Sequence, residues 1–299
     1  MSQQLAKFKL FDLTSRAIVH IIRAMDLESM FFFSLASRKA KYILNYSLPK
    51  NYFHVSYSFW KYEAFIGILY KIFNYYGAIG INWDASFQAG MEVLMTHFAE
   101  SIHLPKISME FGCNTNPETS LALLNHAKTL NSSLNIIQMH LLYLPIEIYR
   151  AFLDVGSRVL QRLHIDSVNA PGFQYRPSEV FKLDELKISD GHWVHLEDFM
   201  ECKQVIVRNM TEHPNMYCAD SKKLNDFFKL WKASSCKLEH LEFDYQNTKD
   251  LSFDEIIAEL DGTNFMQIDR YKSVEIQRED GIKACILITP WYLLMNVLH

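Results

Sequence analysis

The chain has 299 residues, of which 49% are hydrophobic and 21% are charged, so global disorder is excluded and one large domain or two smaller ones are expected. Its net charge of −4 gives no overall attraction for nucleic acid. The five cysteines, at positions 113, 202, 218, 236 and 285, form no C-x-x-C pair. This argues against a disulfide framework and indicates a reducing compartment, the cytoplasm or the nucleus. No apolar stretch approaches the roughly 20 residues of a membrane span, and no signal peptide is visible.

Charge is unevenly distributed along the chain. Residues 1–50 carry eight Lys or Arg and three Asp or Glu, a net +5, which leaves −9 for the remainder. This asymmetry suggests two parts with different roles, although short segments also fluctuate in charge by chance.

The first fifty residues predict three short helices. Thr14 or Ser15 can cap the first helix, Asp26 the second and Ser37 the third. The first helix carries an apolar stripe at helical spacing, formed by Ile18, Ile21, Ile22 and Met25. Three such helices make a very small core, which usually needs a partner or a neighbouring domain.

This segment resembles an F-box. The residues in register are Leu13, Ile18, Ile21, Ile22, Asp26, Met30, Phe33, Ser34, Ser37, Arg38 and Lys41. Thr14 stands where the family usually has Pro, and Ala40 where Trp is common. An unrelated helical cap is the alternative interpretation.

The resemblance implies that residues 1–48 bind the Skp-type linker subunit of a cullin-based ubiquitin ligase. The linker surface is apolar with acidic surroundings by resemblance, which suits the +5 charge. The implied linker-binding residues are Leu13, Thr14, Ile18, Ile21, Ile22, Met30 and Phe33. Nucleic acid is a poor alternative partner because no recognition motif accompanies the basic residues.

Residues 49–299 form the predicted second domain. Pro49 ends the helical segment, 53–59 alternates as a strand, and 85–101 reads as a helix. The periodicity of residues 61–76 is mixed and assigns no element, which leaves the fold of 60–84 open.

A seven-residue pattern, Leu-polar-polar-Leu-polar-apolar-polar, then recurs at 160–166, 183–189 and 238–244. Looser copies lie at 104–110, 134–140, 202–208 and 271–277, and helical patterns at 118–130, 146–159, 224–233 and 254–260. Strands and helices at a period of 20–40 residues are typical of an irregular leucine-rich-repeat-like solenoid, an α/β fold. A doubly wound parallel sheet is the rival, but its strands read as continuous apolar runs, whereas these alternate and predict one solvated face.

The C-terminal strands at 274–278 and in KACILIT flank an Asp-Gly turn, which predicts a closing β-hairpin. The stretches 224–243 and 274–288 resemble the type-2 F-box-associated domain, and the likeness extends over roughly 100–290. In that family the domain is thought to select the protein to be ubiquitinated.

The predicted solvated sheet face supplies the candidate target-binding residues. These are Arg162, His164, Asp166, Glu185, Lys187, His240, Glu242 and Asp244, with Gln138 and His140 on the same predicted face. The mixed charge favours a protein target over nucleic acid. The alternative is that these are merely solvated strand positions.

No residue pattern supports enzyme chemistry or a cofactor. His192 and His195 lack the further ligands of a metal site and read as a polar loop pair. Cys202, Cys236 and Cys285 stand at apolar positions and read as core. Phe227, Phe228 and Trp231 form a stripe that reads as helix-to-sheet packing more readily than as an exposed binding surface.

The sequence therefore predicts a non-catalytic substrate-receptor subunit of a Skp/cullin/F-box ubiquitin ligase, without a cofactor or membrane partner. The alternative is a repeat-type protein-interaction scaffold without ligase function.

Overall fold

The computed structural model describes residues 10–48, 53–59, 63–70, 76–82, 87–101, 106–111, 116–130, 136–141, 145–159, 161–165, 173–189, 191–208, 220–244 and 251–299. The chain divides into two compact units, of which unit 1 comprises Met1–Ser108 and Ala122–Leu134 and unit 2 comprises Met109–Leu121 and Asn135–His299. Strand β4 (Lys106–Phe111) and helix α5 (Pro117–Leu130) run across the division. The predicted domain boundary at 48/49 stays a prediction.

Unit 1 begins with the 3-10 turn η1 (Leu10–Asp12), which was not predicted, followed by the three predicted helices α1 (Ser15–Ala24), α2 (Leu27–Ala36) and α3 (Arg38–Ser47). The predicted strand at 53–59 is β1 (Phe53–Phe59), and its alternate residues Val55, Tyr57 and Phe59 are buried. The predicted helix at 85–101 is α4 (Phe87–Ser101), which buries Met91 and Met95 on the face that its apolar spacing predicts.

Two strands occupy the region to which the sequence assigned no element. β2 (Glu63–Tyr70) pairs antiparallel with β1, and β3 (Tyr76–Asn82) pairs antiparallel with β2. Their apolar runs carry little alternation, and pattern alone does not separate such a run from a buried helix.

Unit 2 contains the strands β5 (Ile136–Leu141), β6 (Arg162–Ile165), β7 (Glu185–Ile188), β8 (Gln204–Val207) and β9 (His240–Asp244), each parallel to the next. Every predicted copy of the seven-residue pattern contains a strand, because its fourth and sixth positions, both apolar, fall on one side of the chain. Burial alternates along β6 to β9, which confirms that one face of these strands is partly solvated.

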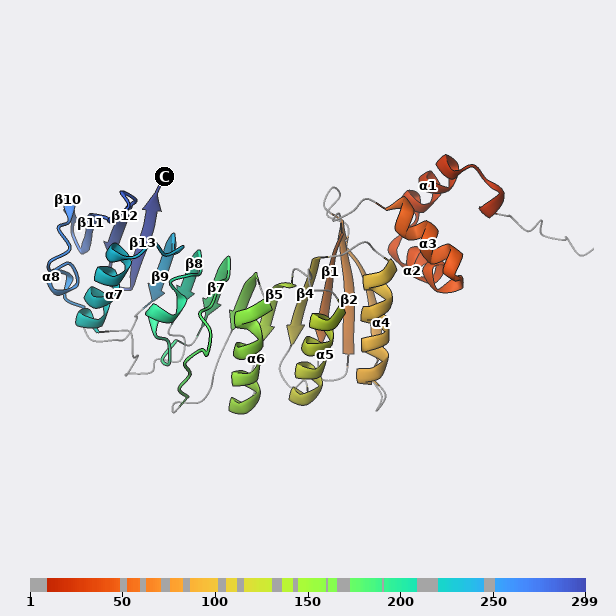
Figure 1. Ribbon diagram of the computed structural model, residues 1–299, viewed down its shortest axis with the longest axis horizontal. Coiled ribbons are helices and arrows are strands. Elements are labelled where there is room, and N and C mark those ends of the chain that lie inside the picture. Colours follow the sequence, from red (N-terminus) through yellow and green to blue (C-terminus); the bar gives the residue numbers. More distant parts are fainter. Residues whose placement is uncertain are drawn as a thin grey trace, which may run out of the picture. The chain divides into compact units, whose positions relative to one another are not determined.

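Helices α6 (Ile146–Val159) and α7 (Ser221–Ala233) belong to unit 2, and Figure 1 shows α7 over one face of the strands. Phe227, Phe228 and Trp231 of α7 are buried, which confirms that this stripe packs inward.

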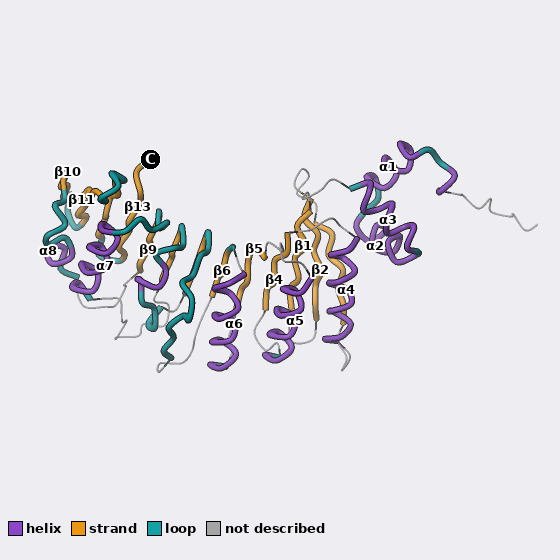
Figure 2. Tube along the Cα trace, in the orientation of Figure 1, coloured by secondary structure: helices purple, strands orange, loops and turns teal. Residues whose placement is uncertain are grey.

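The leucine-rich-repeat-like solenoid is nevertheless wrong. Described residues between β6 and β8 form irregular chain and the short 3-10 helix η2 (Leu196–Phe199) instead of repeated helices (Figure 2). Large aromatic residues fill the space that helices would cover: the Trp193 ring meets Tyr149, Phe173 and Tyr175 edge-on at 5.3–6.1 Å. A strand pattern fixes strands but does not specify the connections that a repeat requires.

The C-terminal end also departs from a solenoid closed by a hairpin. β10 (Thr263–Ile268), β11 (Tyr271–Gln277), β12 (Lys283–Ile288) and β13 (Tyr292–Leu298) are antiparallel, and the order continues β9-β13-β12-β11-β10. The predicted Asp-Gly hairpin is β11–β12, one part of this larger antiparallel sheet. The predicted helix at 254–260 is only α8 (Phe253–Ile256), because Glu259 and Asp261 take left-handed backbone conformations with φ of 62° and 49°.

Candidate functional site

The N-terminal helices begin at the predicted caps. Thr14 Oγ1 accepts from the Ala17 N–H at 3.4 Å, Asp26 Oδ1 from Ser29 at 2.7 Å, and Ser37 Oγ from Ala40 at 3.1 Å. The Ser29 N–H stabilises the Asp26 carboxylate and lowers its pKa below the ordinary value of 3.8. One local hydrogen bond thus sets the start of each of the three helices, as short polar side chains do at N-caps.

The structure separates the predicted linker-binding residues into two groups. Ile18 and Ile22 are buried and belong to the core that α1 forms with α3. Leu13, Ile21, Met30 and Phe33 are half-buried, and Thr14 is exposed. Only the second group presents side-chain surface to a partner.

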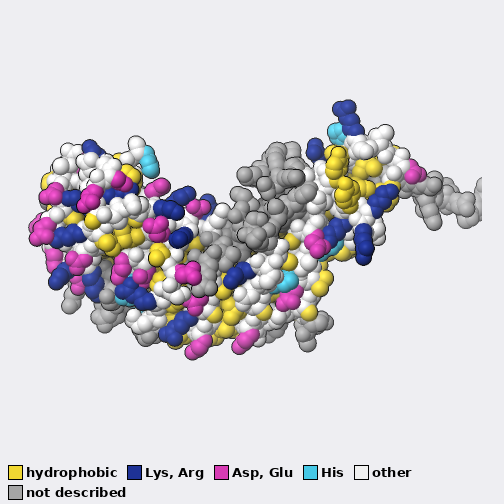
Figure 3. All heavy atoms as spheres, viewed as in Figure 1, with side chains coloured by type: hydrophobic (Ala, Val, Ile, Leu, Met, Phe, Trp, Pro, Cys, Tyr) yellow, Lys and Arg dark blue, Asp and Glu magenta, His cyan; other side chains and the backbone are white. Residues whose placement is uncertain are grey.

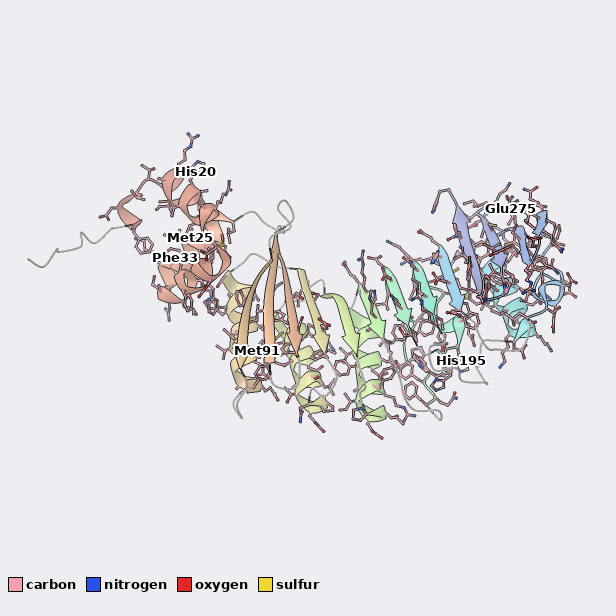
Figure 4. All side chains as sticks on the ribbon, turned by 180° about the vertical axis from the view of Figure 1, so that it is seen from behind. His20, Met25, Phe33, Met91, His195 and Glu275 are labelled. Carbon is pink, nitrogen blue, oxygen red and sulfur yellow. The ribbon has the colours of Figure 1, made fainter. Side chains whose placement is uncertain are left out.

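One end of this half-buried group is extended by η1 and α3. The Phe11 and Phe33 rings lie 6.3 Å apart, and Lys39 Nζ lies 4.6 Å from the centre of the Phe11 ring. Figure 4 shows Phe33 on these helices, together with Met25 and His20. The result is an apolar surface with a cation beside it.

Further exposed apolar side chains lie on the same helices and were not predicted from the sequence. Phe32 and Leu35 of α2 are 59% and 50% exposed, and Tyr42 and Tyr46 of α3 are 70% and 67% exposed. Hydrophobic side chains gather visibly over these helices in Figure 3. Their i, i+3 and i, i+4 spacing was the available signal, but it does not show whether a neighbour covers them.

Another face of α2 is occupied by α4 within unit 1. The Phe31 and Phe98 rings stack at 5.3 Å, and Ser34 Oγ lies 2.7 Å from His97 Nε2. Burial first, and then the nearby Lys41 ammonium, lower the pKa of His97, so this buried contact favours a neutral imidazole. This face packs α2 against α4 and is not available to a partner.

The second candidate surface is the solvated face of the unit 2 strands, here called the open face. Register aligns Arg162, Glu185, Gln204 and His240 in one row across β6 to β9, and His164, Lys187, Ile206 and Glu242 in the next row. Their neighbours along each strand are buried on the opposite side. In Figure 4, which looks from behind, the strands lie in front of the helices.

Polar contacts hold the open face together. His164 Nε2 contacts the Glu185 carboxylate, Arg208 Nη2 lies 3.6 Å from Glu242 Oε1, and His240 Nδ1 lies 2.6 Å from Asn296 Oδ1. These pairs link adjacent strands and keep the side chains in ordered rows.

The predicted target-binding residues lie on this face, with Asp244 opposite Tyr292 in register, except that Asp166 lies outside the described residues. On β5, His140 pairs in register with His164 of β6, and Gln138 lies two residues earlier on β5. Gln204 and Ile206 on β8 and Leu294 and Asn296 on β13 also lie on the open face but were not predicted from the sequence. The looser copy of the pattern at 202–208 was the available signal for the first two, whereas β13 joins the face only through its pairing with β9.

The polar groups considered for chemistry have structural surroundings. His192 and His195 lie in the loop before η2, as expected, and both side chains are buried. Cys202 and Cys236 are buried as expected, and Cys285 is partly exposed. Within the described ranges, no three His, Cys, Asp or Glu side chains gather as a metal site would require, and no helix has the length and apolar character to cross a bilayer.

Comparison with known proteins connects part of unit 2 to a family. Residues 179–243 match the family described as F-box associated. The match spans β7, β8, α7 and β9 and includes the resemblance seen at 224–243, while residues 274–288 lie outside it. No curated protein and no solved structure matches the chain.

Proposed function

We propose that this chain is a substrate-receptor subunit of a Skp/cullin/F-box ubiquitin ligase. Residues 1–48 bind the Skp-type linker, and through it a cullin, while the open face of unit 2 holds a target protein. The observation that carries the proposal is the match of residues 179–243 to the F-box-associated family.

The N-terminal helices support the linker-binding role. They carry the F-box register within a segment, residues 1–50, whose net charge is +5, and they leave Ile21, Met30 and Phe33 half-buried without forming the innermost core. An apolar surface with basic surroundings complements a linker surface that is apolar and acidic by resemblance.

The proposed mechanism is proximity, and this chain is not an enzyme. The receptor raises the effective concentration of target lysines near a charged ubiquitin carrier held by other subunits, which form and break the bonds. We place this assembly in the cytoplasm or nucleus, where Cys202 and Cys236 stay reduced.

Copurification with the Skp-type linker tests the proposal. We expect wild-type chain to retain the linker and Ile21→Asp to lose it, because a carboxylate in an apolar contact costs several kcal/mol unless it is paired. Val93→Asp is the matched control, since Val93 is 68% exposed on α4 of the same unit. Circular dichroism must show that both variants stay folded, and retention of the linker by folded Ile21→Asp contradicts the F-box assignment.

A protein-interaction scaffold without ligase function is the second candidate. It is favoured by Thr14, which occupies the position of the usual Pro and acts as the N-cap of α1. Failure of the wild-type chain to retain the linker, together with retained target binding, identifies this alternative.

A further inference from the structure

The strand β10 is the edge of the antiparallel sheet in unit 2. Among the described residues its only strand neighbour is β11, and all six of its residues are exposed. Phe265, Met266 and Ile268 are 61%, 57% and 61% exposed, and the strand contains no proline. An apolar edge strand with unpaired backbone groups is a template for a further strand.

Register places two of these side chains on the open face. Met266 pairs with Ser273, which pairs with Leu287, which in turn pairs with Leu294. Ile268 pairs with Tyr271 and therefore lies in the adjacent row. Because paired residues share a face of a sheet, a mostly apolar strip, interrupted by Ser273, runs from β13 to the free edge.

A bulge limits the part of β10 that can pair further. The register shifts between Thr263 and Met266, and Asn264 has a left-handed φ of 54°. Only Met266–Ile268 is therefore a regular ladder. A further strand on β10 can therefore form only a short ladder, over these three residues.

We propose that the occupant of this edge is β10 of a second copy of the chain, paired antiparallel about a two-fold axis at Gln267. This register sets Met266 of one copy opposite Ile268 of the other, twice, and joins the two apolar strips on one continuous face. A two-fold axis perpendicular to the sheet keeps both open faces on the same side, as an isologous interface requires.

Charge complementarity supports the same register. Arg270 follows β10 in the turn to β11, and Asn264 lies near the other end of the strand, where its Nδ2 donates to Glu275 Oε2 at 2.6 Å. Figure 4 shows Glu275 in this part of the sheet. Antiparallel pairing directs the Arg270 end of each copy toward the Glu275 end of the other, so opposite charges face each other at both ends of the pairing.

Cysteine cross-linking of the full chain tests the axis. Across an antiparallel pair, facing Cα atoms are about 4.5–5.5 Å apart, within the range of a disulfide. We expect Gln267→Cys to form a covalent dimer under mild oxidation. Met266→Cys should cross-link at least about tenfold more slowly, because its two copies lie roughly 8 Å apart along and across the strands. Wild-type chain on the same gel measures cross-linking by the native cysteines.

Sedimentation equilibrium tests the association without cross-linking. Since the pairing is short and such small interfaces are weak, the concentration series extends to several hundred micromolar. We expect the average mass to rise toward that of a dimer, and Met266→Lys to weaken association at least about tenfold. Leu230→Lys is the control, because Leu230 is 47% exposed on α7, away from the edge.

Three results would overturn the inference. One is a wild-type chain that stays monomeric throughout the series, and another is equal cross-linking of the two cysteine variants. The third is a monomeric chain in which Met266→Lys abolishes binding of an isolated target, since the edge then accepts a foreign strand. Neither assay contains the linker, so the result is independent of the proposed ligase function.

Discussion

Replacing Arg278 by Met tests what holds the C-terminal strands to the segment that matches the F-box-associated family. The Arg278 side chain is 6% exposed, and its Nη1 donates to the Cys236 carbonyl at 2.7 Å. Its Nη2 donates to Asp280 at 2.7 Å, and its guanidinium carbon lies 5.3 Å from the centre of the Trp231 ring. One cation therefore joins the β11–β12 turn to the C-terminal end of α7 and the chain that follows it.

The magnitude follows from the groups that lose their partner. The Cys236 carbonyl is left without this charged donor, which costs about 1–3 kcal/mol for a buried acceptor. Loss of the contact with Trp231 adds about 0.5–2 kcal/mol. Because the two terms share one side chain and are not additive, we expect a loss of about 2–4 kcal/mol in the free energy of unfolding of unit 2.

Urea denaturation followed by circular dichroism measures this loss. Arg176→Met is the matched control, since Arg176 donates to Asp198 at 2.8 Å and to Glu197 at 3.0 Å but its side chain is 50% exposed. Exposed ion pairs contribute about 0–1 kcal/mol, so the control should unfold nearly as wild type does. An Arg278→Met loss no larger than that of Arg176→Met would refute the reasoning.

Three further predictions concern the other surfaces. Thr14→Pro should cost no more than about 1 kcal/mol of helix stability and leave linker affinity equal or tighter. The reason is that φ at Thr14 is already −61° and only the 3.4 Å capping hydrogen bond from the Ala17 N–H is lost. Loss of linker binding, measured by titration calorimetry, contradicts this. The Asp26 carboxyl has a pKa below 3.8 in the folded protein, so its contribution to stability is complete above pH 3.8 and is lost as the pH falls through the lower folded pKa. Acid titration of wild type, followed by helical circular dichroism, should therefore show a loss of signal in this range. The same loss in Asp26→Asn rules out the Asp26 cap as its cause. Replacing Arg162, Lys187 and Glu242 on the open face together by Ala should change the free energy of unfolding by no more than about 1.5 kcal/mol, leave linker binding intact and reduce the affinity for target protein. Unfolding of this variant, or unchanged capture of every partner found by proximity labelling, counts against the target surface.

Local chemistry determined much of this protein. The caps at Thr14, Asp26 and Ser37 and the alternation of the repeated segments depend on residues a few positions apart, so the sequence alone predicted these helix starts and strands. The burial of Phe227, Phe228 and Trp231 followed from their spacing on one helix face. The predicted open face was recovered because burial alternates with the side-chain period of a strand.

Only the tertiary structure decided how the strands connect and which apolar residues stay uncovered. Between β6 and β8 the described residues form irregular chain and η2, with Trp193 packed against Phe173, and β13 inserts beside β9 although 47 residues separate the two strands in the chain. Ile22 and Ile21 look equivalent in sequence, yet one is buried and the other half-buried. Tyr42 and Met266 are apolar like the core residues, but the tertiary structure leaves their side chains exposed. Pairing between distant segments sets each of these features, and local spacing carries no information about it.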